Sequence, residues 1–241
     1  MSIVEFVDYT NDNIKIIDNE DIKHPYESIF DEHEDGENYE IKKIYYGTEL
    51  LPSTINIGDC IYDPPYDNYT VYTASINNDN NYVLKKGVFE SEEELINEIK
   101  RQNKAAEFGL SDPIIVAYML ENETEYGLIM KKYEQSLFDI FDSEYYDLED
   151  KIKYVDRIKI MLEDLAEKVK ISHGDFNLDN IMVDEDDNLK LVDFGKGCAI
   201  LDDDSKKNID TENFNNCNFY LDTISEQVTF DLQNYWYEIM K

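Results

Sequence analysis

The first half of the chain alternates short apolar runs with polar, turn-forming stretches, a pattern typical of β-strands joined by tight connections. We predict strands at residues 41–46, 69–74, 82–85, 114–119 and 126–130. The segment 69–74 reads Tyr-Thr-Val-Tyr-Thr-Ala, which is rich in the β-branched and aromatic residues that favour sheets. An additional hairpin is predicted within residues 1–18, where the apolar runs 3–9 and 14–17 flank a polar turn.

One helix interrupts this β-rich half. Ser91 followed by Glu94 forms a capping box that predicts the start of the helix at this serine. Gly109 is a natural stop. The residues expected on the buried face of this helix are Leu95, Ile99, Gln102 and Ala106.

The second half opens with a helical pattern and continues into a hairpin. Apolar residues recur at intervals of three and four, which predicts a long buried helix carrying Ile152, Val155, Ile158, Leu162, Leu165 and Val169. Further on, the apolar runs 181–183 and 189–192 flank a polar turn at 184–188. A hairpin returns the chain to its starting end, so we expect Asn180 and Asp193 to lie close together.

Two polar motifs surround that hairpin. The first is His173-Gly174-Asp175-Phe176-Asn177-Leu178-Asp179-Asn180, and the second is Asp193-Phe194-Gly195. Phosphoryl transfer from ATP needs such a set, since one carboxylate orients the acceptor hydroxyl while an Asn and an Asp hold magnesium against the phosphates. The motifs resemble those of the protein kinase-like superfamily, in which H-x-D-x-x-x-x-N is the catalytic loop and D-F-G the metal-binding turn.

The resemblance implies a two-lobe α+β protein kinase-like fold with ATP and magnesium in the cleft. Residues 41–132 would form the N-lobe, and residues 133–241 a compact, mainly helical C-lobe without a full peptide-docking platform. Residues 1–40 would be an acidic N-terminal extension. The resemblance covers about residues 41–200 and is most specific at the two motifs.

The resemblance also assigns roles to individual residues. Asp175 would be the catalytic base, while Asn180 and Asp193 would bind magnesium. Lys85 ends a strand that looks like the V-A-I-K strand, so it would bind the nucleotide phosphates. Glu98 on the following helix would be the ion-pair partner of Lys85.

Strand alternation supports Lys85 over its neighbour Lys86, because it places Val83 and Lys85 on the same face of the strand. Glu94 competes with Glu98 for the role of partner, but its place in the capping box gives it a structural task. The alternative for each residue is a solvated position on the surface of a strongly acidic chain.

The segment 128–133 resembles the strand that enters the adenine-binding hinge. Backbone groups of Lys131 and Tyr133 would contact the base, and Met130 would lie behind it. A buried strand that simply runs into a loop is the alternative.

Three departures from the family pattern bear on the acceptor and on nucleotide binding. Gly174 replaces the usual Arg, and H-G-D resembles RIO-type kinases and the aminoglycoside and choline phosphotransferases. Asn177 stands where serine/threonine kinases usually carry Lys. The stretch 58–68, where a glycine-rich loop is expected, holds one Gly and three Asp, so fewer backbone amides can approach phosphate closely.

The net charge of −33 argues against nucleic acid or an anionic membrane as partner and favours a basic protein substrate. Cys60, Cys198 and Cys217 are scattered without metal-ligand spacing. With no signal peptide visible, we therefore expect free thiols in a reducing, cytoplasmic compartment.

The sequence thus predicts an ATP- and magnesium-dependent phosphotransferase, first of all an atypical protein serine/threonine kinase. A small-molecule kinase of the H-G-D type is the alternative enzyme. A pseudokinase that acts as a binding module is the non-enzymatic alternative, and the glycine-poor stretch 58–68 is the feature that favours it.

Overall fold

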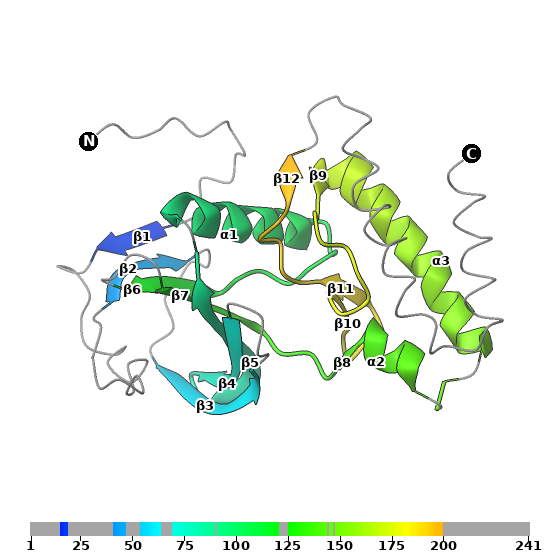
Figure 1. The fold of residues 1–241 in the computed structure, drawn as a ribbon, viewed down its shortest axis with the longest axis horizontal. Helices are drawn as coiled ribbons and strands as arrows, with labels where there is room; N and C mark the ends of the chain where they lie inside the picture. Colours follow the sequence, from blue (N-terminus) through cyan, green and yellow to red (C-terminus); the bar gives the residue numbers. More distant parts are fainter. Residues whose placement is uncertain are drawn as a thin grey trace. The chain divides into compact units, whose positions relative to one another are not determined.

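The computed structural model describes residues 15–18, 41–46, 54–63, 69–89, 91–120, 125–143, 145–146 and 148–199 (Figure 1). The chain divides into two compact units. The first unit comprises Met1–Lys104 and Pro113–Lys132, and the second comprises Ala105–Asp112 and Tyr133–Lys241. The architecture is mixed α+β, and the two-lobe kinase fold remains a prediction.

A seven-stranded antiparallel sheet forms the first unit, with strand order β1-β2-β6-β7-β5-β4-β3. Its strands are β1 (Lys15–Asp18), β2 (Ile41–Tyr46), β3 (Ile55–Tyr62), β4 (Tyr69–Ile76), β5 (Asp79–Val88), β6 (Val116–Leu120) and β7 (Glu125–Lys131). The five predicted strands of this half are all present, with ends that differ by up to three residues.

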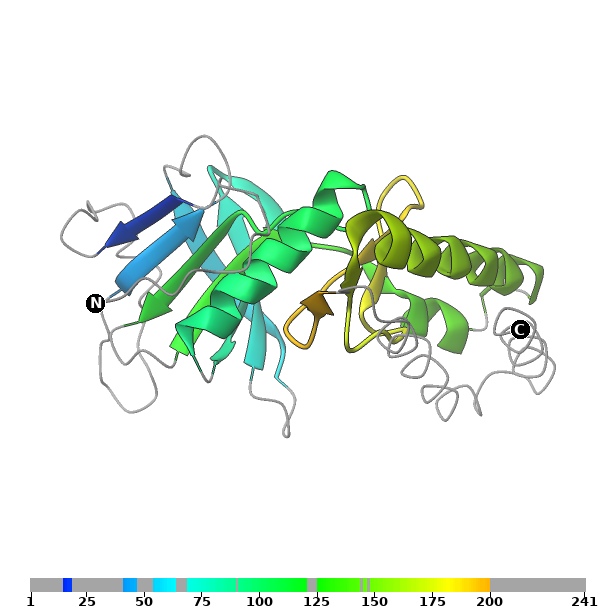
Figure 2. The same cartoon turned by 90° about the horizontal axis from the view of Figure 1, so that it is seen from above.

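The two faces of this sheet carry separate hydrophobic clusters, as strand alternation requires. Along β6, Tyr118 packs on one face with Leu84 and Ile129, whereas Met119 packs on the other face. Helix α1 (Glu92–Glu107) covers the second face, where Leu95 and Ile99 are fully buried (Figures 1 and 2). The inner strands are therefore buried on both sides.

The ends of α1 follow the signals in the sequence. The Ser91 hydroxyl accepts a hydrogen bond from the amide of Glu94 at 3.4 Å, and Gly109 adopts φ +75°, a left-handed conformation that suits glycine after a helix. The expected buried face needs one correction. The buried face continues from Gln102 to Ala105, three residues further on. Ala105 is therefore buried, whereas Ala106 is only partly buried.

Strand β1 lies within residues 1–40 and coincides with the second half of the hairpin predicted there, the apolar run 14–17. Its backbone pairs with β2, from Lys15 opposite Tyr46 to Asp18 opposite Lys43. The predicted extension therefore contributes an edge strand to the sheet. The other half of the predicted hairpin, residues 3–9, lies outside the described residues, as does most of the acidic segment before residue 41.

The stretch expected to replace the glycine-rich loop is partly strand. Gly58 to Tyr62 belong to β3, whose pairing with β4 is interrupted by register shifts after Ile57 and Cys60. Cys60 is an exposed free cysteine. Residues 64–68 lie outside the described part of the chain.

The second unit joins helices to three short strand pairings. Its helices are α2 (Leu137–Asp142), α3 (Leu148–Asp164) and the π-helical segment Leu165–Val169. Its strands are β8 (Gln135–Ser136), β9 (Ile171–Ser172), β10 (Ile181–Val183), β11 (Leu189–Leu191) and β12 (Cys198–Ala199). Strands β8, β10 and β11 form one small sheet, and β9 pairs with β12. None of the described helices is long and apolar enough to cross a membrane.

Helix α3 packs its apolar face into the core of this unit, but Ile152 is not on that face. Val155 and Ile158 are buried there, whereas Ile152 is 42% exposed. The buried position one residue earlier belongs to Lys151, whose ammonium group donates to the carbonyls of Phe141 and Ser143. The amphipathic stem of a lysine can occupy an apolar face when its charged end finds acceptors.

Residues 105–112 join the second unit because they hydrogen-bond to β11. The Leu191 amide donates to the Leu110 carbonyl at 2.7 Å, and the Ser111 hydroxyl donates to the Leu191 carbonyl at 2.6 Å. Lys190 also donates to the Gly109 carbonyl. The sequence pattern shows no sign of these pairings, because they depend on tertiary structure.

The turn between β10 and β11 is organised by the Asp184 carboxylate. It accepts hydrogen bonds from the amides of Asp186 and Asn188 and from the Asn188 side chain. Burial would raise the pKa of Asp184, but these hydrogen bonds together with the nearby charge of Lys190 lower it. Ionised Asp184 therefore stabilises the folded hairpin.

We predict that Gly127→Ala lowers the free energy of unfolding by about 1–3 kcal/mol, because overpacking a full core forces neighbours to shift. A Cβ on the buried Gly127 would overlap the ring of Tyr118. Chemical denaturation checks the value. The same glycine substitution in a Tyr118→Leu background should cost clearly less. An equal cost in both backgrounds would contradict this packing.

We predict that Asp184→Ala lowers the free energy of unfolding at pH 7 by about 1 kcal/mol, the usual net value of a turn hydrogen bond. Because the folded-state pKa is lowered, the stabilisation is present above the ordinary Asp pKa and is lost as pH falls through the folded value. Denaturation from pH 7 to pH 3 should therefore show the two proteins converging. Asp186→Ala, in the same turn, serves as control and should change stability little at either pH.

Candidate active site

The register of the β10–β11 hairpin brings two predicted metal ligands to one end. Ile181 lies opposite Leu191, and just beyond this pair the Val192 amide donates to the Asn180 carbonyl at 3.0 Å. Asp193 follows Val192 directly, so the backbones of Asn180 and Asp193 lie at the same end of the hairpin. This placement of the two backbones agrees with the hairpin predicted from the sequence.

The Asn180 side chain also connects to the predicted base. Its amide nitrogen donates to the Asp175 carbonyl at 2.9 Å. The Asn180 backbone amide in turn donates to the Asn177 side-chain oxygen at 3.0 Å. These bonds hold the loop 175–180 in a compact turn and keep Asp175 close to Asn180.

His173 links the two motifs from inside the core. The ring is fully buried, its Nε2 lies 2.8 Å from the Val192 carbonyl, and its Nδ1 accepts from the Asp175 amide at 3.4 Å. This network assigns the proton to Nε2. Phe194 packs against the ring with centroids 4.6 Å apart. His173 therefore positions Asp175 relative to the residue that precedes Asp193.

Two backbone conformations in this region are unusual. Asp193 has φ +66°, which is a sparsely populated conformation for a residue with a side chain. Such conformations persist where surrounding contacts impose them, and they concentrate at functional sites. Gly174 has φ +80°, and a Cβ there would overlap the Lys196 carbonyl. Arg in place of Gly174 cannot fit this backbone path.

Lys196, which the sequence analysis does not single out, forms an ion pair with the predicted base. Its ammonium nitrogen lies 2.9 Å from Asp175 Oδ2. The signal that could have identified it is its place directly after Asp193-Phe194-Gly195, where a cation is notable in a chain with 22 basic and 55 acidic residues.

In the first unit, Lys85 and Glu98 form a buried ion pair. The Lys85 ammonium lies 3.3 Å from Glu98 Oε1, and Glu98 is fully buried while Lys85 is 8% exposed. The Lys85 ammonium also lies 4.9 Å from the centre of the Tyr69 ring, within cation–π range. The expected pairing of these two residues is present, and their role toward a nucleotide remains a prediction.

The two competitors for these roles have other contacts. Lys86 points to the opposite side of β5 and lies 3.9 Å from Glu125. Burial lowers the pKa of Lys86, and the charge of Glu125 opposes that shift. The Glu94 amide donates to the Ser91 hydroxyl that caps α1, as described above.

The segment predicted to hold adenine coincides with a passage of the chain between the two units. Met130 is buried in the α1-facing cluster, and Lys131 ends β7. Tyr133 begins the second unit, where its hydroxyl donates to Asp112 Oδ2 at 2.7 Å. Burial and this acidic neighbour raise the pKa of Tyr133 well above its usual range. Tyr133 is thus tied to Asp112, the residue at which the chain leaves the second unit for the first.

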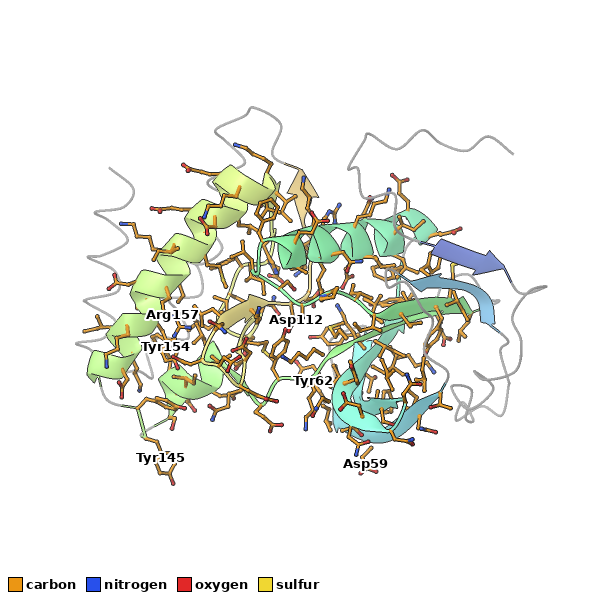
Figure 3. The ribbon with its side chains drawn as sticks, turned by 180° about the vertical axis from the view of Figure 1, so that it is seen from behind. Asp59, Tyr62, Asp112, Tyr145, Tyr154 and Arg157 are labelled. Atoms are coloured by element: carbon orange, nitrogen blue, oxygen red, sulfur yellow. The ribbon has the colours of Figure 1, made fainter. Side chains whose placement is uncertain are left out.

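Helix α3 hydrogen-bonds to the turn of the β10–β11 hairpin, at the end opposite Asn180. Tyr154 donates to Asp187 Oδ1 at 2.7 Å, and Arg157 donates to Asp187 Oδ2 at 3.0 Å and to the Asp187 carbonyl. Figure 3 shows Tyr154 and Arg157 together on α3. Desolvation and the Asp187 hydrogen bond raise the pKa of Tyr154 to about 12. The turn opposite the site is therefore held against the helix.

Asn180 and Asp193 are residue types that could hold a magnesium ion whose remaining ligands are water and phosphate. Because the Asn180 amide nitrogen donates to Asp175, the orientation of the amide group is set and its oxygen is directed elsewhere. One amide oxygen and one carboxylate suit magnesium, which keeps several waters and phosphate oxygens in its shell. Among the described residues, no three His, Cys, Asp or Glu side chains are placed to hold a metal by themselves.

Comparison with known proteins gives a partial relationship. No protein-family model matches the chain. A segment of 74 residues, 30% of the chain, is 35% identical to a probable serine/threonine-protein kinase KIN1 homolog of Enterocytozoon bieneusi (strain H348). The match spans 12% of the length of that protein. The chain is therefore similar in part to a protein kinase.

Proposed function

We propose that this protein is an ATP- and magnesium-dependent phosphotransferase and that its acceptor is a serine or threonine hydroxyl of a basic protein. The observation that carries the proposal is the arrangement of the loop 175–180 against Asp193. One backbone bond joins Asn180 to Val192, and one side-chain bond joins Asn180 to Asp175. These bonds keep Asp175 and Asn180 near Val192, the residue before Asp193, which supports the assignment of a base and two oxygen ligands to these three positions.

The proposed roles follow from the chemistry of each group. Asp175 accepts the proton of the acceptor hydroxyl, and it is about one-third exposed, so a substrate can reach it. Asn180 and Asp193 hold magnesium, which when bound neutralises negative charge on the phosphate oxygens. Lys85, held by Glu98, binds the nucleotide phosphates.

The buried ion pair in the first unit supports this proposal independently. Removing two charges from water costs several kcal/mol per ion, and mutual attraction offsets that cost only with good geometry. A buried Lys85–Glu98 pair is therefore a weak device for stability, and perturbed buried charges are frequent at functional sites. Binding of an anion by Lys85 gives the pair a function.

A small-molecule acceptor remains the second candidate because of Gly174. The chain carries H-G-D, with the Lys196 backbone in the space that a larger residue would need. Position 174 therefore holds no arginine and has no room for one. Regulation by pairing of such an arginine with a phosphorylated loop is not part of the proposal.

We predict that Mg-ATP stabilises the protein against heat, by about 2.7 kcal/mol at a hundredfold excess over its dissociation constant. Asp193→Asn should weaken this magnesium-dependent binding, as calorimetry would show. Asp175→Asn should leave binding nearly unchanged and abolish phosphoryl transfer, because Asp175 serves the acceptor. Asp142→Asn, an exposed carboxylate at the end of α2, is the matched control.

Absence of stabilisation and of calorimetric binding at millimolar Mg-ATP would exclude both enzymatic functions. Binding without any transfer to protein, small molecule or water would leave the pseudokinase. Equal transfer by wild type and Asp175→Asn would exclude the assigned base.

We predict that the preferred acceptor is a basic protein, because the net charge of −33 attracts cations and repels anions. Label from ATP should appear on histones rather than on acidic proteins such as casein. The rate should fall as salt increases from 50 to about 300 mM, since exposed charges are screened beyond about 8 Å at physiological ionic strength. Label that appears only on a cationic small molecule such as an aminoglycoside would favour the second candidate.

A further inference from the structure

Lys196 is placed on the predicted base by its position after the Asp193-Phe194-Gly195 turn. Its ammonium nitrogen lies 2.9 Å from Asp175 Oδ2. The Lys196 side chain is 71% exposed and that of Asp175 is 35% exposed. Exposed ion pairs contribute little to folding stability, so stability alone does not account for a lysine at this place.

The path of the chain at Lys196 is constrained by the residues around it. The Lys196 carbonyl occupies the space beside Gly174 that a Cβ would fill. The Gly197 amide donates to the Phe194 carbonyl at 3.0 Å. Strand β12 then pairs with β9, with Cys198 opposite Ser172. The chain is therefore held before and after Lys196, which keeps the start of its side chain near Asp175.

Asn177 cannot provide the positive charge that serine/threonine kinases usually carry at this position. Asn177 is neutral, and its side-chain oxygen accepts from the Asn180 amide at 3.0 Å. This bond shapes the loop that carries Asp175. Lys196 brings a positive charge to the same carboxylate from another part of the chain.

The loop needs this charge because negative groups gather in it. Asp175 and Asp179 both lie in the loop 175–180, and Asp179 is exposed. A phosphoryl group that approaches Asp175 would be repelled by these carboxylates unless a cation offsets them.

We propose that Lys196 contacts the transferring phosphoryl group and shields it from the charge of Asp175. This inference rests on the proposed phosphotransferase function and extends it by one residue. In the step, the acceptor oxygen forms a bond to the γ-phosphorus while its proton passes to Asp175. The bond to the β–γ bridging oxygen breaks, and ADP leaves with the electron pair. Lys196 keeps its proton and its charge throughout.

Kinetics of Lys196→Met test this role in the full-length chain. Transfer from ATP to histone should lose about ten- to a hundredfold in kcat, below the loss for a buried donor because the site is partly exposed. KM for ATP should change by less than about threefold, since the contact forms mainly in the transition state. Lys196→Arg should recover most of the rate. Lys153→Met is the matched control, because Lys153 is 62% exposed and pairs with Asp150 at 3.0 Å.

Chemical labelling gives a second readout that does not depend on turnover. Acetylation of Lys196 in the wild type, followed by mass spectrometry, should slow in the presence of magnesium and a non-hydrolysable ATP analogue. Mg-ADP should protect it much less, because ADP lacks the γ-phosphate. Lys153 should be labelled equally in all samples.

The outcomes separate this inference from the proposed function. The role of Lys196 would be overturned, with the phosphotransferase function left intact, by either of two results. One is a Lys196→Met variant as active as an active wild type. The other is equal protection of Lys196 by the ATP analogue and by ADP. A wild type that binds no Mg-ATP would overturn both the role of Lys196 and the phosphotransferase function. The role of Lys196 would be supported if Lys196→Met is slow with an unchanged melting temperature and Lys196→Arg restores the rate. Protection of Lys196 from acetylation should then also depend on the γ-phosphate.

Discussion

The hydrogen bond from the Val192 amide to the Asn180 carbonyl is the constraint on which the site depends. It closes the β10–β11 hairpin at the end where Asp175, Asn180 and Asp193 lie. The other contacts adjust this arrangement: His173 joins Val192 to Asp175 from the core, and Asp187 anchors the far turn to α3. Loss of hairpin register would separate the two predicted metal ligands, because a shift by one residue turns every side chain to the other face.

The first unit places its charged residues by a different principle. Lys85 and Glu98 lie between a strand and a helix that are both buried on their facing sides, so their side chains have few alternative positions. The cost of burying the two charges is offset by their mutual attraction and by the Tyr69 ring beside the lysine. The proposed binding of an anion by Lys85 would use a charge whose position is already set by Glu98.

Much of the local structure could be predicted from the sequence because it depends on neighbours along the chain. Alternation along β5 indicates that Lys85 rather than Lys86 pairs with Glu98, and turn residues 184–188 indicate the hairpin. Helix periodicity was less reliable. The spacing predicts burial of Ile152, but Lys151 occupies the buried position by directing its ammonium group to two carbonyls.

Features that depend on tertiary contacts could not be predicted in this way. Three such contacts join segments that are distant along the chain: the bonds of β11 to residues 110–111, the pairing of β1 with β2 and the Tyr133–Asp112 bond. Gly174 shows the limit most clearly. The sequence reveals the departure from the family pattern, but only the structure shows that the Lys196 carbonyl lies where a Cβ would be.

We propose that Asn180 and Asp193 together hold a divalent ion that also binds the nucleotide. Manganese can replace magnesium as a hard, oxygen-preferring ion and broadens NMR signals of nearby groups. With ATP and substoichiometric manganese, we predict strong broadening of the Asn180 side-chain amide signal in the wild type and loss of this broadening in Asp193→Asn. An unbroadened Asn180 amide in wild-type protein that has bound manganese and ATP would contradict it.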